Sequence, residues 1–239
     1  MNASDLTGRS CLVTGAGSGI GRAIALDLAA AGADVTAVGR RRSALEGTTG
    51  RAQSGRITIH PADLTVDQNL DDLAGRFLAG GLDVLVHSAG AYAQGPLEQA
   101  PVEALDLQYR INVRAAYRLT QALLPALKAS QGQIVFINST VGLAARANVA
   151  QYAATKHALK ALADALRDEI NPAGVRVLSV YPGRTATDQQ ASIYELEGRA
   201  YAPETLLQPE DVAATVVGAL TLPRTAELTD LRVRPMRKH

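Results

Sequence analysis

The hydrophobic positions of the chain form short runs separated by longer amphipathic stretches. The runs, rich in apolar and β-branched residues, are SCLVT, DVTAVG, RITIH, LDVLVHSAG, GQIVFIN, VRVLSVYP and, more weakly, ELTDLRV. Strands that alternate with helices in this way build βαβ units with parallel strands. Because the runs are nearly continuous in apolar character, both faces of the sheet should be covered. We therefore predict an α/β fold, a doubly wound, mostly parallel seven-stranded sheet with helices on both faces.

The same pattern indicates one domain over residues 1–239, with no low-complexity linker and no internal repeat. The widest interruption runs from Pro182 to Pro209, which is long for a connection within a compact domain. We interpret it as an inserted binding loop or lid, not as a domain boundary.

The segment QYAATKHAL raises a question about a lysine. Continued as a helix, it gathers a stripe of apolar residues, namely Leu159, Leu162, Leu166 and Ile170. Tyr152 and Lys156 project to nearly the same side as this stripe, whereas His157 and Lys160 point away. A lysine on the buried side needs partners, although a bare Tyr-x-x-x-Lys is more often ordinary packing with a snorkelling lysine.

A glycine-rich loop, TGAGSGIG, spans Thr14 to Gly21 between the first strand and the first helix. Glycine lets the backbone approach a pyrophosphate, and the following helix offers free N–H groups. The spacing of Gly15, Gly19 and Gly21 departs from the G-x-G-x-x-G fingerprint, because Ile20 stands where its last glycine would be. Taken alone, the loop suits a dinucleotide, another nucleotide-type ligand such as a methyl donor, or a plain tight turn.

Several motifs together resemble the classical short-chain dehydrogenases/reductases. They are TGAGSGIG, HSAG, Asn112 in YRINVRAAY, Ser139 in INSTVG, YAATK and YPGRTAT, in the order and spacing of that family and across essentially the whole chain. The resemblance implies a single-domain Rossmann fold, a nicotinamide cofactor and four catalytic residues, Asn112, Ser139, Tyr152 and Lys156.

Two positions depart from the family pattern. His87 and Ser88 replace the two asparagines of its N-N-A-G motif, whereas Ala89 and Gly90 are retained. The C-terminal segment LRVRPMRKH lacks the glycine pair that many members carry after the last strand. The first departure concerns the bracing of the central sheet and the second concerns subunit contacts.

The resemblance gives each catalytic residue a role. A tyrosine has an ordinary pKa of about 10, and a nearby cation favours its phenolate. Tyr152 is expected to protonate the carbonyl oxygen during reduction, with Ser139 hydrogen-bonding that oxygen. Lys156 is expected to contact the ribose hydroxyls of the cofactor, and Asn112 to hold a water that links Lys156 to solvent.

The end of the second predicted strand, DVTAVGRRRSAL, indicates the cofactor. NAD-specific folds usually place an acidic residue there. Here Gly39 holds that position, and Arg40, Arg41 and Arg42 follow. We predict NADP(H), with a charged, solvated helix start as the alternative. The expected cofactor-binding residues are Gly15, Ser18, Gly19, Ile20, Gly21, Arg40, Arg41, Asp63, Leu64, Ala89, Gly90, Tyr152, Lys156, Pro182, Gly183, Thr185 and Thr187, of which Asp63 and Leu64 should flank the adenine.

The resemblance also places residues around the substrate, giving a partly apolar pocket. They are Tyr92, Val141, Leu143, Gln151, Arg184, Ile193 and Tyr194. For Arg184 three interpretations stand: it grips an anionic group of the substrate, a phosphate of the cofactor or a carbonyl of the loop. Fold does not fix the substrate.

Composition excludes other classes of function. A net charge of +1 gives no global field for nucleic acid or an anionic membrane. The single cysteine, Cys11, excludes an intramolecular disulfide and a cysteine-based zinc site, and no cluster has metal-ligand spacing. The start MNASDLTGRSCLVTG lacks the pattern of a signal peptide, and no apolar run could span a bilayer. We therefore expect a cytoplasmic protein.

These observations predict an NADPH-dependent oxidoreductase that transfers hydride between the nicotinamide and a carbonyl or secondary alcohol. The alternative from another class is a non-catalytic, NADP(H)-sensing regulatory protein, against which the four catalytic residues speak. An epimerase or dehydratase of the extended branch would need a larger C-terminal domain than this chain has room for. The resemblance, together with long helices predicted from Val102 to Lys128 and from Ala150 to Asn171, also suggests a homotetramer or homodimer.

Overall fold

The strands form one fully parallel sheet. The structure is a computed structural model that describes residues 6–236; residues 1–5 and 237–239, the latter ending the segment LRVRPMRKH, lie outside it. The strand order is β3-β2-β1-β4-β5-β6-β7, and every neighbouring pair is parallel. The strands are β1 Ser10–Thr14, β2 Asp34–Gly39, β3 Arg56–Pro61, β4 Val84–His87, β5 Gln133–Ile137, β6 Arg176–Pro182 and β7 Asp230–Val233. The weak run ELTDLRV thus forms a strand, and the predicted sheet is confirmed.

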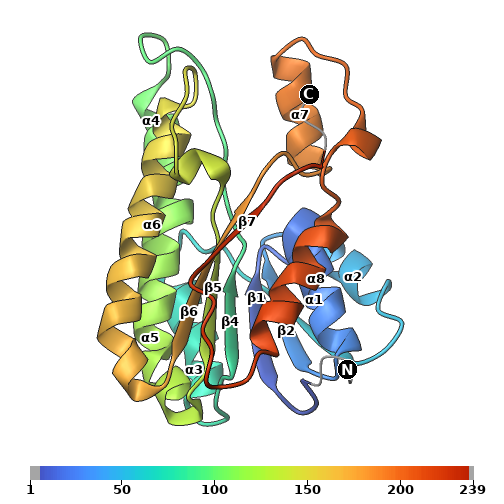
Figure 1. The fold of residues 1–239 in the computed structure, drawn as a ribbon, viewed down its shortest axis with the longest axis vertical. Coiled ribbons are helices and arrows are strands. Elements are labelled where there is room, and N and C mark those ends of the chain that lie inside the picture. Colours follow the sequence, from blue (N-terminus) through green and yellow to red (C-terminus); the bar gives the residue numbers. More distant parts are fainter. Residues whose placement is uncertain (1–5, 237–239) are drawn as a thin grey trace.

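Helices cover both faces of this sheet, as predicted (Figure 1). They are α1 Gly19–Ala30, α2 Arg42–Thr49, α3 Asp67–Leu78, α4 Val102–Tyr109, α5 Ala115–Ser130, α6 Ala150–Ile170, α7 Asp188–Leu196 and α8 Pro209–Leu220. Helices α1, α2 and α8 lie on one side, and α3, α5 and α6 lie on the other. Helix α7 stands apart from both layers, beyond the carboxyl ends of the strands.

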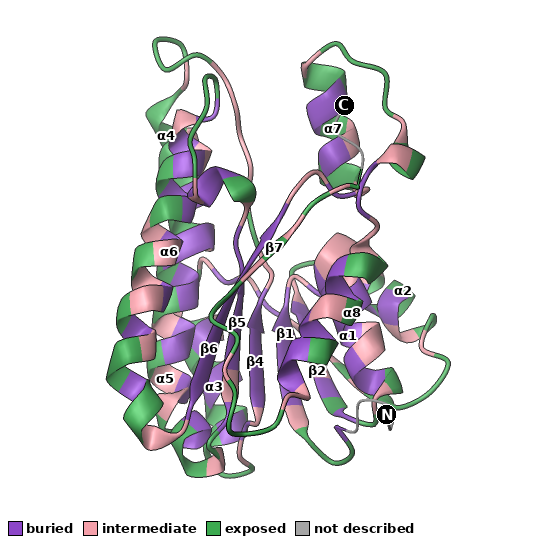
Figure 2. Ribbon diagram, viewed as in Figure 1, coloured by how far each residue is buried: buried purple, intermediate pink, exposed green. Residues whose placement is uncertain are grey.

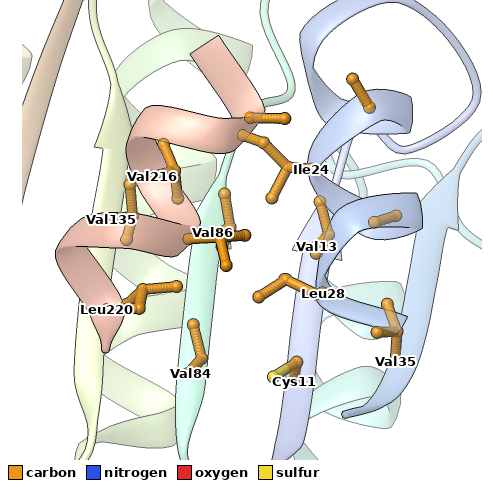
Figure 3. Close-up of a cluster of buried hydrophobic side chains, with 14 of the residues drawn as sticks. Cys11, Val13, Ile24, Leu28, Val35, Val84, Val86, Val135, Val216 and Leu220 are labelled. Carbon is orange, nitrogen blue, oxygen red and sulfur yellow. The ribbon is translucent and has the colours of Figure 1, made fainter. Parts of the chain in front are cut away.

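Each face of the sheet carries its own hydrophobic core. Along β4, Val84 and Val86 face the cluster under α1 and α8, whereas Leu85 faces the cluster under α3, α5 and α6. Figure 3 shows Ile24 and Leu28 of α1 meeting Val86 and Val216 in the first cluster. The inner strands β1, β4, β5 and β6 are buried along almost their whole length (Figure 2), which explains why their sequences are apolar without alternation. The edge strands β3 and β7 instead alternate exposed and partly buried residues.

The predicted helix from Val102 to Lys128 is interrupted. Between α4 and α5 lies a π-helical turn, Arg110–Arg114, which contains Asn112. Such turns insert a residue into the helical repeat and often mark functional sites. Apolar periodicity does not reveal a single inserted residue, which is why the sequence suggested one continuous helix. By contrast, the predicted helix from Ala150 to Asn171 is found as α6, Ala150–Ile170.

The segment from Pro182 to Pro209 is more ordered than a loop. It contains α7 and a short 3-10 turn, Pro203–Thr205. Thr187 caps α7, because its hydroxyl accepts a hydrogen bond from Gln190 N at 3.1 Å. The two ends of the segment are joined by an isolated parallel bridge between Thr185 and Leu207. Among the residues that the structure describes, no helix is long and apolar enough to cross a membrane.

Candidate active site

The glycine loop after β1 is shaped by close backbone contacts. A Cβ atom on Gly15 would lie 2.7 Å from Ala89 N, and Gly15 has a φ of +69°. A Cβ atom on Gly21 would lie 2.4 Å from Gly15 O. Both distances are shorter than real Cβ contacts, so this loop requires glycine at these two positions.

Thr14 fixes the loop to the chain segment that follows β4. Its buried hydroxyl donates to Val86 O at 3.2 Å and accepts hydrogen bonds from Ser88 N at 3.1 Å and Ala89 N at 3.2 Å. Thr14 is the first residue of TGAGSGIG, but it was not among the predicted site residues. The contact brings the glycine loop and the HSAG motif to one edge of the sheet.

His87 braces the same region in place of the family's asparagine. Its ring stacks on Phe136 at a centroid distance of 4.9 Å, and Nε2 lies 2.8 Å from Thr120 Oγ1. Burial lowers the pKa of His87 to about 3, so the ring is neutral at physiological pH. The substitution thus preserves a buried polar contact with α5.

The start of α1 offers a site for an anion. Ser18 precedes the helix without capping it through its side chain, and the first turn contains no acidic residue. The first N–H groups of a helix have no intrahelical partner and carry the positive end of the dipole. Together with a loop whose glycines lack Cβ atoms, these groups fit the pyrophosphate of a dinucleotide.

The side chains from α6 and from the end of β5 meet as expected. The Ser139 hydroxyl lies within hydrogen-bonding reach of the Tyr152 hydroxyl. Lys156 Nζ lies 5.7 Å from the centroid of the Tyr152 ring and donates to Ile137 O at 3.0 Å. Lys156 is buried, which answers why a lysine occupies the inner side of this helix.

Burial dominates the titration of this pair. It raises the pKa of Tyr152 well above its ordinary value, and the hydrogen bond with Ser139 only partly opposes this effect. Burial also lowers the pKa of Lys156 to about 8. The expectation that Lys156 brings the pKa of Tyr152 down is therefore not met by the protein alone. Tyr152 holds its proton at neutral pH.

Asn112 joins three segments through its buried amide. Oδ1 accepts from Ala91 N at 2.7 Å, and Nδ2 donates to Ala91 O at 2.9 Å and to Thr155 Oγ1 at 3.0 Å. The π-helical turn places this amide between the segment after β4 and α6. Both Nδ2 protons are thus used by the protein, and Oδ1 keeps acceptor capacity.

A cavity of about 310 Å³ lies at the carboxyl ends of the strands, where ligands bind in open α/β sheets. It brings together most of the predicted cofactor-binding and catalytic residues. They are Gly15, Ser18, Gly19, Ile20, Gly21, Ala89, Gly90, Ser139, Tyr152, Lys156, Pro182, Gly183, Thr185 and Thr187. Of the predicted substrate residues, Tyr92, Val141, Arg184 and Ile193 line it as well.

The remaining predicted residues lie outside the cavity lining, namely Arg40, Arg41, Asp63, Leu64, Asn112, Leu143, Gln151 and Tyr194. The parallel register places Gly39 opposite Pro61, which brings the ends of β2 and β3 together. Asp63 accepts hydrogen bonds from Thr65 N and Oγ1, and these bonds, with the charge of Arg40 nearby, lower the pKa of Asp63. Arg40 and Asp63 therefore belong to one neighbourhood at the edge of the site.

Several residues that line the cavity were not predicted from the sequence. They are Ser88, Ile137, Asn138, Thr140, Arg146, Gln189 and Gln190. Asn138 had a local signal, because it precedes Ser139 at the end of a strand; its amide accepts from Ser139 N and donates to Lys156 O. Arg146 and the two glutamines are placed by loops and by α7, and no motif marks them.

Arg184 is held by α7. Its Nη2 donates to both carboxylate oxygens of Glu197 at 2.8 Å, and its guanidinium lies 4.8 Å from the centroid of the Tyr194 ring. Arg199 also contacts Glu197, at 3.2 Å, and lies 4.8 Å from the same ring. Burial opposes ionisation of Glu197, but the hydrogen bonds and charges of these arginines lower its pKa.

A parallel sheet wound on both faces, with a glycine loop and an Asn-Ser-Tyr-Lys set at its carboxyl edge, defines a dinucleotide-binding enzyme of the Rossmann type. The family model for short chain dehydrogenases matches residues 9–198. The chain belongs to the short-chain dehydrogenase/reductase family and is an oxidoreductase of that family. The predicted resemblance is confirmed.

Comparisons over the full length agree with this assignment. An uncharacterised oxidoreductase of Staphylococcus aureus is 32% identical over 234 residues, covering 97% of this chain and 99% of the relative. An alcohol dehydrogenase of Thermococcus sibiricus, complexed with 5-hydroxy-NADP, superposes with a TM-score of 0.86 at 26% identity, covering 97% and 98% of the two chains. A 7α-hydroxysteroid dehydrogenase complexed with NADH and 7-oxo glycochenodeoxycholic acid gives 0.87 at 26% identity, covering 98% and 96%.

Proposed function

We propose that the protein is an NADP(H)-dependent oxidoreductase that interconverts a carbonyl compound and its secondary alcohol, with Tyr152 as the general acid and base. One observation carries this proposal. Ser139, Tyr152 and Lys156 line the same cavity as the glycine loop. A dinucleotide held by that loop and a substrate at Tyr152 would therefore share one cavity.

The protonation states suit the reduction direction. NADPH, when bound, supplies the hydride that reduces the carbonyl carbon. Tyr152, whose raised pKa keeps it protonated, donates its proton to the carbonyl oxygen, and Ser139 donates a hydrogen bond to the same oxygen. Lys156 would exchange its contact with Ile137 O for the ribose hydroxyls, and its charge would stabilise the phenolate left after the proton leaves. Asn112 would hold a water on its Oδ1, which continues the proton path.

The edge of the site supports a preference for NADP(H) over NAD(H). Gly39 supplies no carboxylate to bind a ribose 2′-hydroxyl or to repel a 2′-phosphate. Arg40 is exposed beside the end of β2, and Arg41 precedes α2. Arg22, on α1, also feels the charge of Arg41. The Thermococcus alcohol dehydrogenase holds an NADP derivative, whereas the 7α-hydroxysteroid dehydrogenase holds NADH, so the arginines carry this part of the proposal.

The test is turnover of a panel of ketones, aldehydes and alcohols with NADPH and NADH, followed by the absorbance of the reduced nicotinamide. For a substrate found in this way, Tyr152→Phe is expected to lower kcat by at least about 100-fold, since a general acid is lost. Binding of NADPH should survive. Tyr117→Phe, an exposed tyrosine on α5, serves as the matched control. If Tyr152→Phe keeps more than about half of kcat with chemistry rate-limiting, the role of Tyr152 is wrong.

Failure of every panel member with both cofactors, while NADPH still binds, would favour the NADP(H)-sensing alternative. No feature of the described residues favours that alternative now, because Ser139, Tyr152 and Lys156 are assembled at the cavity.

We further propose that the protein forms a closed homo-oligomer, a tetramer or a dimer, in the cytoplasm. Exposed apolar side chains on α4, including Leu105, Leu107 and Tyr109, support an interface there. The single cysteine is a buried free thiol, which suits a reducing compartment. A monomeric mass by light scattering at micromolar concentration would contradict the oligomer.

A further inference from the structure

The charges on the cavity lining are one-sided. Arg146, Lys156 and Arg184 line it, and no aspartate or glutamate is among the described residues of the lining. Lys156 has a place in the proposed reaction, and the glycine loop and α1 suit the phosphates of the cofactor. Arg146 and Arg184 are therefore two cations that the proposed chemistry does not use.

Arg146 lies on the substrate side of Tyr152. The Tyr92 ring packs edge-on against the Tyr152 ring, with centroids 4.8 Å apart. Burial raises the pKa of Tyr92, and the nearby guanidinium of Arg146 opposes this, while the Tyr92 hydroxyl donates to Gln94 Oε1 at 2.6 Å. Arg146 is thus one aromatic ring away from Tyr152. It follows the 3-10 turn that begins after Ser139, whereas the glycine loop follows β1.

Arg146 has no carboxylate to neutralise it at close range. It takes part in none of the ion pairs within residues 6–236. Glu197 feels its charge, but the close partners of Glu197 are Arg184 and Arg199. The two arginines that line the cavity, Arg146 and Arg184, therefore have one carboxylate nearby, Glu197, and Arg199 also pairs with it from outside the lining.

Arg184 is fixed in place and keeps a free donor. Its Nη2 is engaged by Glu197, and its guanidinium stacks on Tyr194. Its Nη1 is buried and, among the described residues, has no hydrogen-bond partner. A buried donor without an acceptor is unfavourable, and a ligand that supplies the acceptor gains the corresponding stabilisation. The charge of Arg184 also reaches Tyr92.

We propose that the substrate is a carbonyl compound, or the matching alcohol, that carries a carboxylate remote from the reacting carbon, and that Arg146 and Arg184 bind this carboxylate. This inference rests on the proposed function of the site. Tyr92, Val141 and Ile193 supply apolar lining between the two ends of such a molecule.

The arrangement also limits the spacing within the substrate. The reacting oxygen lies at Tyr152, and Arg146 lies beyond the Tyr92 ring that packs against it. We therefore expect keto acids whose two functional groups are separated by several carbons to be better substrates than 2-oxo acids.

Two other uses of the arginines make different predictions. If Arg184 binds a phosphate of the cofactor, its loss weakens the binding of NADPH whatever the substrate is. If the only role of Arg146 is to attract Glu197 and so hold α7 near the cavity, its loss affects charged and uncharged substrates equally. A carboxylate-binding role affects the charged substrate alone.

The experiment uses linear methyl ketones that end in a carboxylate, in a series of chain lengths, and the methyl esters of the same acids. We expect wild-type kcat/KM to favour the best acid over its ester by about 10- to 150-fold, the range for hydrogen bonds to a charged group. Because Arg184 remains, Arg146→Gln should lower this preference through the KM of the acid without abolishing it, and leave the ester unchanged. Arg199→Gln is the matched control, because Arg199 touches Glu197 and Tyr194 but does not line the cavity.

Equal efficiency for acids and esters in the wild type, or an equal effect of Arg146→Gln on both, overturns the inference while leaving the proposed oxidoreductase intact. If neither series is turned over, binding decides: hexanoate and hexanamide are titrated into the NADP⁺ complex by calorimetry. Tighter binding of hexanoate that is weakened in Arg146→Gln supports the anion site even where the proposed reaction fails. Equal binding of the two ligands rejects it.

Discussion

The two sides of the cavity are built in different ways. The side formed by the glycine loop and α1 is defined by backbone, with Gly15 and Gly21 in contacts too close for any Cβ atom and Thr14 fixing the loop to the next strand. The side formed by α7 is defined by side chains. It is connected to the sheet region through the Thr185–Leu207 bridge and the pair of Arg184 with Glu197.

This difference separates a general task from a specific one. Every substrate of such an enzyme needs the same cofactor, so the cofactor side can be fixed by the path of the backbone. The substrate side must match one molecule. Side chains on its short helix can be replaced without disturbing the sheet, so the sequence of this side can vary more readily. We expect changes on the first side to act on stability and cofactor, and changes on the second to act on substrate.

The largest effect on the cofactor side should come from its charged edge. Replacing Gly39 by Asp and Arg40 by Gln should reverse a preference for NADPH over NADH of about 10- to 150-fold, chiefly through the KM of the cofactor. The aspartate can be built, because a Cβ atom on Gly39 would lie 3.4 Å from the flexible Leu45 side chain. The measurement is kcat/KM for both cofactors at one ionic strength.

Arg42→Gln is the control for this double variant, since Arg42 is the last arginine of the run and lies at the exposed start of α2. Equal wild-type efficiency with NADPH and NADH would mean that the three arginines are only a charged, solvated helix start and do not select the cofactor.

The backbone definition of the glycine loop gives the next prediction. Gly21→Ala should lower the free energy of unfolding by about 1 to 3 kcal/mol and weaken NADPH binding, because its Cβ would lie 2.4 Å from Gly15 O. Gly75→Ala in α3 is the control; its Cβ meets nothing within 4 Å, so it should stabilise the protein by about 0.5 to 1 kcal/mol. Urea unfolding and NADPH titration measure both. Similar behaviour of the two variants would show that the loop can relax.

The fold and the cofactor side could be predicted from the sequence because their signals are local. Strand runs, the glycine spacing and the Tyr152–Lys156 pair on α6 each follow from a few adjacent residues and their periodicity. Arg146 and Glu197 could not be predicted, because what they contact depends on how α7 packs against segments far away in the chain. The π-helical turn at Asn112 was not predicted for a related reason, since the contact that it makes, with Ala91, joins segments that are apart in the chain.

Acidification should weaken the cofactor side through His87. Its pKa in the folded protein, about 3, lies below the ordinary 6.5, so between these values the unfolded chain binds more protons. Stability is therefore full above about pH 6.5 and falls as pH falls, by up to about 1.4 kcal/mol per pH unit. Urea unfolding at neutral pH and near pH 5 should show a smaller loss in His87→Asn. His157→Asn, an exposed histidine on α6, is the control, and an unchanged slope in His87→Asn would exclude His87 as the source.

The smallest effect should come from the side-chain contacts that hold α7. Glu197→Gln removes a partly buried ion pair with Arg184, which should loosen α7 by about 1 kcal/mol and speed its amide hydrogen exchange about 5-fold, without a comparable change at α1. Because the pKa of Glu197 is lowered in the folded protein, this stabilisation is present above its ordinary value of 4.5 and is lost as pH falls. Glu204→Gln, exposed on the same segment, is the control.

We expect NADPH and a bound ketone to slow amide hydrogen exchange in α7 as the segment closes over the cavity. Exchange in α7 that stays the same with both ligands would contradict this closure. Exchange that rises equally at α1 and α7 in Glu197→Gln would mean that the two sides open as one unit and that the contrast between them is wrong.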